Sequence, residues 1–373
     1  MTATAGDVRS ELRSVLDSML SAHASSERVR EVAASPAWGD EQLWNRLTEV
    51  GVHALSVPEA LGGAGESIEL SAVVLEAAGA HLPVAPLLSS QVAARLLANI
   101  GEPASALLPG LLDGSSRLTS VIAHPGEPSG ARWPITATGS SGEVRLSGQY
   151  PIVLDGADAA AVLVQAQAPD GVVVAVVKPT DTGVELGRCD SLDLTRRIAR
   201  LSLADAPASV LASGEAAERA LERTQVEQAY LLAAEQLGAA QRCLDMSTSY
   251  AKTRVQFGKP IGVFQAISHS CANMYVEVEA TRSLVEATGG ALASDDWDEA
   301  RQYAAALESF ASETLLDCAQ RMVQIHGGIA ITWEFDAHLY LRRAKSTEVL
   351  FGRPSAHRAE LLDLALAATE AKA

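Results

Sequence analysis

The sequence is poor in aromatic residues, in cysteine and in basic charge. Aromatic residues make up only 4% of its 373 positions, so the core is expected to consist mostly of Ala, Leu and Val. The four cysteines lie far apart without a CxxC pair, which argues against a disulfide framework or a zinc site and indicates thiols in a reducing compartment. The formal net charge of −17 leaves no basic footprint for nucleic acid.

Long hydrophobic runs are also missing. No window reaches 18 uncharged apolar residues, so the sequence predicts no membrane span. Residues 1–19 carry Asp, Arg and Glu throughout, a pattern that does not fit a signal peptide. Together with the cysteine pattern, these features predict a cytoplasmic protein.

Three regions of different texture follow one another along the chain. Residues 1–115 have helical spacing, as in the apolar positions of Val8–Leu20. Residues 116–212 contain short β-branched or alternating runs between Gly, Pro and Asp, such as Val172–Lys178, and these predict a small barrel or sandwich. Residues 213–373 are helical again, and Asp295 or Asp296 is expected to cap a late helix. The order predicts an α+β fold.

Two segments of the last region carry a resemblance to a known family. The first is Tyr250-Ala-Lys-Thr-Arg-Val-Gln-Phe-Gly-Lys-Pro-Ile-Gly-Val-Phe-Gln-Ala-Ile-Ser-His269, and the second starts with Gln324-Ile-His-Gly-Gly328 and ends at Lys345. Both resemble signatures of the acyl-CoA dehydrogenases. The resemblance implies an N-terminal helical domain (1–115), a middle β-barrel domain (116–212) and a C-terminal four-helix-bundle domain (213–373). It also implies FAD as cofactor and an acyl-CoA as substrate.

The resemblance further implies which residues contact the flavin of a neighbouring subunit. A guanidinium fork suits the oxygens of a pyrophosphate, and adjacent glycines let the backbone approach a cofactor closely. The implied cofactor-binding residues are Arg254, Gln256, Phe257, Gln265, Gln324, Gly327 and Gly328. His326 has no other histidine at metal-ligand spacing, so it is expected to be a packed side chain, and no metal site is predicted.

Other positions depart from the family pattern. The segment that holds a chain's own flavin reads Ala123-His-Pro-Gly-Glu-Pro-Ser129, which keeps little of the family's T-E-P-x-A-G-S-D. Ile152 and Leu154 stand where the family has a Trp and a hydroxyl residue that touch the isoalloxazine, unless this divergent strand aligns differently. Phe351 stands where the best-known members carry the catalytic Glu before Gly352.

The catalytic base is therefore unassigned in this sequence. Some members of the family place it on the helix that leads into the Arg254 segment, and counting back from Gly238 puts Gln228 at that position. Glu227 is its neighbour on the helix, and Glu235 lies two turns later on nearly the same side. Both are weak candidates for a relocated base.

Three hypotheses remain open at this point. The first is a non-catalytic subunit that pairs with a homologous, flavin-competent acyl-CoA dehydrogenase subunit acting on a bulky acyl-CoA thioester. The second is a self-sufficient homo-oligomeric dehydrogenase with a relocated base, and the third is a non-enzymatic scaffold with the same fold. The Ala-rich helices expected over Ala233–Ala251 and Ile267–Leu284 suit close packing in an oligomer core.

Overall fold

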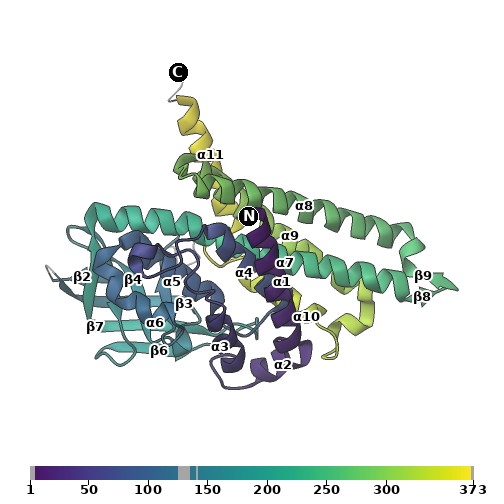
Figure 1. Ribbon diagram of the computed structural model, residues 1–373, viewed down its shortest axis with the longest axis horizontal. Coiled ribbons are helices and arrows are strands. Elements are labelled where there is room, and N and C mark those ends of the chain that lie inside the picture. Colours follow the sequence, from purple (N-terminus) through teal and green to yellow (C-terminus); the bar gives the residue numbers. More distant parts are fainter. Residues whose placement is uncertain (1–4, 125–134, 140–141, 371–373) are drawn as a thin grey trace. The chain divides into compact units, whose positions relative to one another are not determined.

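The computed structural model describes residues 5–124, 135–139 and 142–370, and it divides into two compact units. Unit 1 comprises residues 1–29, 72–83 and 229–373, and unit 2 comprises residues 30–71 and 84–228. The succession of helices, strands and helices confirms the predicted fold class (Figure 1). The three domain boundaries given above stay a prediction.

The first region is helical. Its helices are α1 (Ala5–His23), α2 (Ser26–Ala34), α3 (Glu41–Glu49), α4 (Ile68–His81), α5 (Leu87–Ile100) and α6 (Leu108–Leu112). Asp40 caps α3 by accepting a hydrogen bond from the Leu43 N–H at 3.2 Å. Leu43, Trp44 and Leu47 recur at helical spacing and are buried, so α3 has one apolar face.

The middle region forms a sheet that closes on itself. Its strands are β1 (Leu118–Val121), β2 (Ile135–Thr138), β3 (Glu143–Leu154), β4 (Ala161–Ala168), β5 (Gly171–Val177), β6 (Val184–Arg188) and β7 (Ile198–Ser213). The pairing order runs β4-β2-β3-β7-β5, and β5 also pairs with β4. A closed path of five strands results, with β1 and β6 attached to it, which is the barrel expected from the sequence.

The burial of each strand accounts for the pattern of apolar and polar residues along it. β5 is a run of valines that lies between two strands, and nearly all of it is buried. β3 alternates buried and exposed residues until it reaches irregularities between Leu146 and Gly148 and between Tyr150 and Val153. Leu146, Val164 and Leu201 are fully buried members of the apolar core of this sheet.

The last region consists of long helices. They are α7 (Gly214–Thr253), α8 (Gln265–Ala293), α9 (Trp297–His326), α10 (Ala337–Thr347) and α11 (Pro354–Glu370), with the short strands β8 (Val255–Gln256) and β9 (Lys259–Pro260) between α7 and α8. Asp296 is the N-cap of α9 and accepts from the Glu299 N–H at 3.1 Å, so one of the two expected caps is confirmed.

Two glycines set the packing of α4 against α7 within unit 1. A Cβ added at Gly79 would lie 1.8 Å from the Glu235 carbonyl oxygen, and one added at Gly238 would lie 1.8 Å from the Glu76 carbonyl oxygen. Only glycine fits at either position, because both close neighbours are backbone atoms. The crossing places Glu76 where Arg13 of α1 and Arg282 of α8 both pair with its carboxylate.

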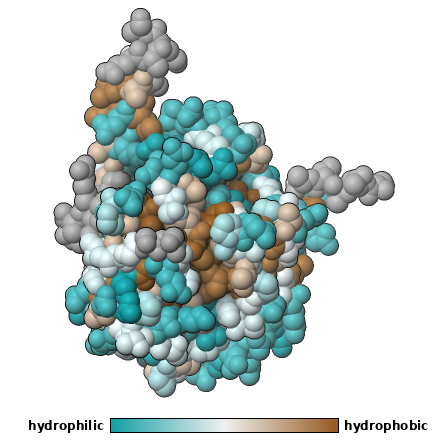
Figure 2. All heavy atoms as spheres, turned by 90° about the vertical axis from the view of Figure 1, so that its left-hand side faces the viewer, coloured by the Kyte–Doolittle hydropathy of each residue, from teal (hydrophilic) through white to brown (hydrophobic). Residues whose placement is uncertain are grey.

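On the face of the molecule that Figure 2 shows, hydrophilic residues predominate and hydrophobic residues form smaller patches. No helix in the described parts of the chain is long and apolar enough to cross a membrane. Within the same residues, no group of three or more His, Cys, Asp or Glu side chains is arranged to hold a metal ion.

Candidate functional site

The Arg254 segment forms a tight hairpin at the end of α7. β8 and β9 pair through Val255 with Pro260 and Gln256 with Lys259. The turn between them consists of Phe257 and Gly258, which both have a positive φ, of 53° and 79°. Two successive left-handed residues match the right-handed twist of a two-residue hairpin. The Phe257 side chain is 89% exposed as a result.

Arg254 is held at the base of this hairpin by its backbone. Its N–H donates to the Tyr250 carbonyl at 2.8 Å, and its carbonyl accepts from the Ile261 N–H at 2.8 Å. Its side chain is exposed and makes no hydrogen bond or ion pair with the described residues. A fixed backbone with an unengaged guanidinium is a suitable donor for a phosphate oxygen.

The second signature segment lies at the end of α9. Gly327 ends that helix with a φ of 63°, and neither it nor Gly328 has an atom within 4 Å of the place where a Cβ would stand. Gln324, Gly327 and Gly328 are all exposed. The two glycines therefore present bare backbone to the outside, to which a flat or charged group has direct access.

The two segments meet at one end of unit 1. The rings of Tyr250, in the last turn of α7, and His326, the last residue of α9, stack at a centroid distance of 4.3 Å. Gln265 begins α8 directly after the hairpin and is exposed too. The ring contact thus joins the two segments at Tyr250 and His326, and all seven residues expected from the sequence are exposed.

Phe351 lies in the turn between α10 and α11. It has a φ of 63° and Gly352 follows with 112°, so two left-handed residues form this turn. A bulky residue rarely adopts this conformation. The Phe351 side chain has no carboxylate. Burial lowers the pKa of the nearby His357, although the Glu360 charge and a hydrogen bond to the Phe351 backbone raise it.

Glu235 and Glu227 are both engaged by arginines. The Glu235 carboxylate lies 2.5 Å from the Arg343 guanidinium of α10, and both side chains are 5% exposed. Glu227 lies 2.5 Å from Arg95 and also accepts from the Asn99 amide at 2.8 Å. Each carboxylate is thus the acceptor of a buried, charge-assisted pair, which accounts for its burial without a catalytic role.

The segment after β1 is tied to its own chain by three glutamines. The Ala123 N–H donates to Gln165 Oε1 at 2.9 Å, and the Ala123 carbonyl accepts from Gln225 Nε2 at 3.0 Å. The Gln228 amide contacts a ring nitrogen of His124. The backbone of Ala123 is therefore fully hydrogen-bonded within the chain, and residues 125–129 of this segment lie outside the described part.

The two strand positions expected from the sequence at the isoalloxazine, Ile152 and Leu154, carry apolar side chains. Leu154 is buried, and its carbonyl accepts from Thr119 Oγ1 at 2.6 Å. Ile152 is 39% exposed. Neither side chain can donate or accept a hydrogen bond, so this strand does not replace the contacts that the family pattern supplies there.

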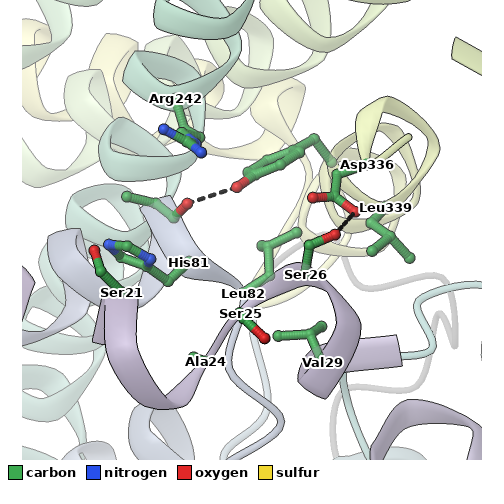
Figure 3. A pocket seen from close by; sticks show the side chains of 12 residues that line it. Ser21, Ala24, Ser25, Ser26, Val29, His81, Leu82, Arg242, Asp336 and Leu339 are labelled. Atoms are coloured by element: carbon green, nitrogen blue, oxygen red, sulfur yellow. Dashed lines mark hydrogen bonds between the residues drawn. The ribbon is translucent and has the colours of Figure 1, made fainter. Parts of the chain in front are cut away.

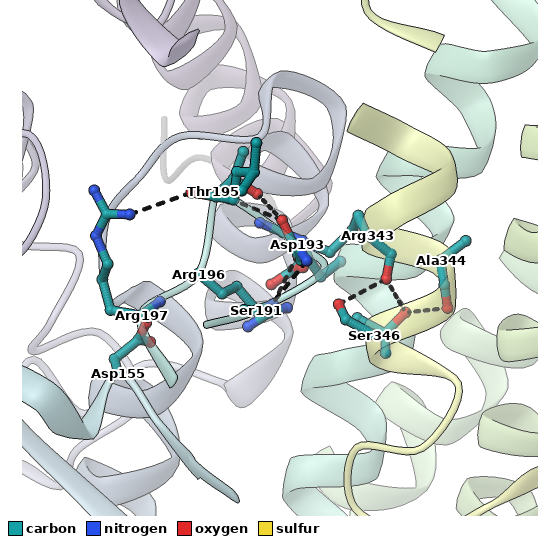
Figure 4. A network of polar contacts seen from close by, with 12 residues as sticks. Asp155, Ser191, Asp193, Thr195, Arg196, Arg197, Arg343, Ala344 and Ser346 are labelled. Carbon is teal, nitrogen blue, oxygen red and sulfur yellow. Dashed lines mark hydrogen bonds and ion pairs between the residues drawn. The ribbon is translucent and has the colours of Figure 1, made fainter. Parts of the chain in front are cut away.

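Several polar clusters were not expected from the sequence. Arg197 donates to carbonyl oxygens in the last turn of α2 and just after it, among them Val32 at 2.7 Å and Ala37 at 3.0 Å. Close to Arg197 in the chain, Asp193 accepts a hydrogen bond from Thr195 (Figure 4). A pocket of about 210 Å³ in unit 1 is lined by Ser21, Ser26, His81, Arg242, Asp336 and Tyr340 with several apolar side chains (Figure 3). None of the expected site residues lines this pocket.

Family models match most of the chain. The model of the acyl-CoA dehydrogenase N-terminal domain matches residues 2–115, and the model of the acyl-CoA dehydrogenase C-terminal domain matches residues 214–363. Residues 116–213 lie between the two matches.

Similar proteins include acyl-CoA dehydrogenases of Mycolicibacterium smegmatis and Mycobacterium tuberculosis. Acyl-CoA dehydrogenase IpdE2 of Mycolicibacterium smegmatis is 36% identical over 349 residues, covering 93% of this chain and 95% of IpdE2. Acyl-CoA dehydrogenase FadE34 of Mycobacterium tuberculosis is 35% identical over 92% of this chain, which corresponds to 46% of FadE34.

Solved structures of the same fold include heteromeric ones. A variant of the steroid ACAD Tcur3481–Tcur3483 superposes with a TM-score of 0.89 at 32% identity, covering 98% of this chain and 100% of that chain. The ChsE4–ChsE5 complex of Mycobacterium tuberculosis gives a TM-score of 0.86 at 28% identity, covering 96% and 97%. The signatures, the fold and these relatives lead to one conclusion: the chain belongs to the acyl-CoA dehydrogenase family.

Proposed function

We propose that this chain is the non-catalytic subunit of a heteromeric, FAD-dependent acyl-CoA dehydrogenase. In this role it completes the flavin site of a homologous partner and forms part of the oligomer core. The observation that carries the proposal is an asymmetry. The residues that would serve a neighbour's flavin are exposed, and their side chains make no hydrogen bond or ion pair with the described residues, whereas those that would serve the chain's own flavin are altered or internally bonded.

FAD bound at such a shared site would take up the hydride that leaves the β-carbon of an acyl-CoA. From this chain, Arg254 would donate to the diphosphate, and the backbone at Gly327 and Gly328 would lie against it. Gln256, Gln265 and Gln324 add neutral donors and acceptors around the same cofactor. The proton at the α-carbon would be removed by a base of the partner, since Phe351 has no group that accepts a proton.

An exposed apolar surface supports the need for a partner. Six large apolar side chains are solvent-exposed. They lie on the hairpin, on the turn after it, on the η5 turn (Gly327–Ile331) and just after η5: Val255, Phe257, Val263, Ile329, Ile331 and Trp333. They lie in the same two segments as the expected flavin contacts. Apolar side chains around polar contacts are typical of a surface that another subunit covers.

The relatives favour this class of enzyme and substrate. IpdE2 is an acyl-CoA dehydrogenase, and the solved structures that resemble the chain at 28% and 32% identity are a ChsE4–ChsE5 complex and a steroid ACAD. We therefore infer a bulky acyl-CoA thioester, such as one with a steroid-derived acyl group, as the substrate of the assembled enzyme. A cytoplasmic location fits the reduced cysteines.

The test uses Arg254 in the assembled enzyme. Arg254→Ala, co-expressed with a flavin-competent homologue, is expected to lower FAD retention by the equivalent of roughly 1.5–3 kcal/mol, the scale of a hydrogen bond to a charged group. Arg200→Ala serves as the control, because Arg200 is an exposed arginine on β7, away from both signature segments in the chain. Equal FAD content in the Arg254 variant and the wild type would refute the assignment.

A further inference from the structure

Three stacked rings join the segments that carry the expected flavin contacts. His326 lies between Tyr250 and Phe335, with centroid distances of 4.3 Å and 4.4 Å and interplanar angles of 28° and 35°. All three belong to unit 1. Aromatic pairs at such distances contribute about 0.5–1.5 kcal/mol each beyond the burial of their area.

The imidazole is fixed in rotation as well as in position. Its Nδ1 lies 2.8 Å from the Met322 carbonyl oxygen, one helical turn earlier. A carbonyl oxygen only accepts, so Nδ1 carries the hydrogen in this contact. Burial lowers the pKa of His326, although the bond to Met322 raises it, and the residue is 4% exposed. A neutral ring with one defined orientation follows.

The contact between Tyr250 and His326 lies next to both exposed segments, where His326 is buried and Tyr250 is partly buried. Residues 252–260, which form the hairpin and its approach, are all exposed, so the hairpin has no buried residue of its own. Tyr250 precedes Arg254 by one helical turn and accepts its N–H at 2.8 Å. His326 directly precedes Gly327. The two rings in contact therefore connect the helix end that carries the Arg254 backbone with the helix end that carries the two glycines.

Phe335 extends the same contact to a third segment. It follows the exposed Ile331 and Trp333 and lies just before α10. His326 is thus in contact with the last turn of α7, from which the hairpin starts, and with the loop after the glycine turn. Figure 1 shows the hairpin of β8 and β9 at the far end of α7 and α8, where the helices provide no further layer to hold it.

We propose that His326 is a positioning residue that holds Arg254 and the Gly327–Gly328 backbone in register, so that together they form one dinucleotide-diphosphate surface. The inference rests on the proposed function, because it concerns the same cofactor. It adds a role for a side chain that touches no cofactor itself and acts through Arg254.

The experiment compares two substitutions in the co-expressed complex. His326→Leu keeps an apolar side chain of similar size without a ring, and His326→Phe keeps a ring. FAD affinity is measured by titrating the flavin-depleted complex with FAD and following flavin fluorescence. His326→Leu is expected to weaken FAD binding roughly tenfold, the scale of losing two ring contacts, and His326→Phe is expected to restore most of it.

A double-mutant cycle separates positioning from general stability. If His326 acts through Arg254, the losses from His326→Leu and Arg254→Ala are not additive, because a displaced arginine has little left to lose. Additive losses, or an unchanged affinity in His326→Leu, would overturn the proposal. Tyr250→Leu removes the ring on the α7 side. If the His326 variant fails to assemble, Tyr250→Leu is combined with Arg254→Ala in the same double-mutant cycle. A wild-type complex that takes up no FAD would instead refute the proposed function.

Discussion

The buried pair of Glu235 and Arg343 is expected to be a main support of the helical unit. It joins α7 to α10 across 108 positions of sequence, with the carboxylate and the guanidinium 2.5 Å apart and both side chains 5% exposed. Arg343→Met would leave the Glu235 carboxylate buried without the cation that faces it. Removing one partner of a buried pair typically costs about 3–5 kcal/mol.

This cost converts into a measurable change in melting temperature. For a compact unit of this size, 1 kcal/mol shifts Tm by about 2–4 °C, so Arg343→Met is expected to lower Tm by roughly 6–20 °C. Scanning calorimetry of the purified chain at neutral pH measures the shift. Arg342→Met is the matched control, because Arg342 is the adjacent arginine of α10 and is only half-buried.

A second substitution, at Glu235, tests whether the unpaired carboxylate causes the loss of stability. Glu235→Met combined with Arg343→Met removes both charges, and replacing a whole buried pair by apolar side chains is often neutral or stabilising. The double variant is therefore expected to melt well above Arg343→Met. A double variant no more stable than Arg343→Met, or a single variant that melts like the wild type, would contradict the reasoning. It would also reopen Glu235 as a residue kept for catalysis.

Two further predictions follow from other residues. The isolated chain is expected to give no acyl-CoA-dependent flavin reduction. Phe351→Glu is expected not to restore that reduction, since the backbone of Ala123 is already hydrogen-bonded within the chain. A stopped-flow assay that shows flavin reduction by either protein would contradict this prediction. Burial raises the pKa of Glu308 well above 4.5, although hydrogen bonds from Ser312 and Gln236 lower it, so its contribution to stability is present in full below about pH 4.5 and is lost as the pH rises toward the raised value. Glu308→Gln is therefore expected to flatten the decline of Tm as the pH rises above about 4.5, and an unchanged slope would contradict this role of Glu308.

Local patterns in the sequence predicted local structure well. The run predicted over 172–178 became β5 (Gly171–Val177), because its valines fit a strand that is buried on both faces. Asp296 caps α9 because its side chain reaches the N–H of Glu299, three residues on. The expected site residues were also identified from short sequence segments, and such segments can be recognised without knowing how the rest of the chain folds.

Long-range pairs could not be predicted in the same way. Nothing near Glu235 in the sequence indicates that Arg343 faces it, and His326 gave no sign that Tyr250 and Phe335 enclose its ring. Such contacts depend on how helices cross, and here the crossing of α4 and α7 depends on Gly79 and Gly238 in two distant segments. The sequence supplied the residues of the candidate site, and the packing of the helices decided which of them lie together.

The most direct test of the central claim is the mass and flavin content of the chain, alone and with a flavin-competent homologue. Light scattering at micromolar concentration gives the mass, and the absorbance of released flavin gives the count of FAD per chain. The account predicts a colourless preparation of the chain alone and a yellow heterotetramer after co-expression, with fewer FAD molecules than chains. A monomer of 39.0 kDa in both samples, or a yellow homo-oligomer with one FAD per chain, would contradict it.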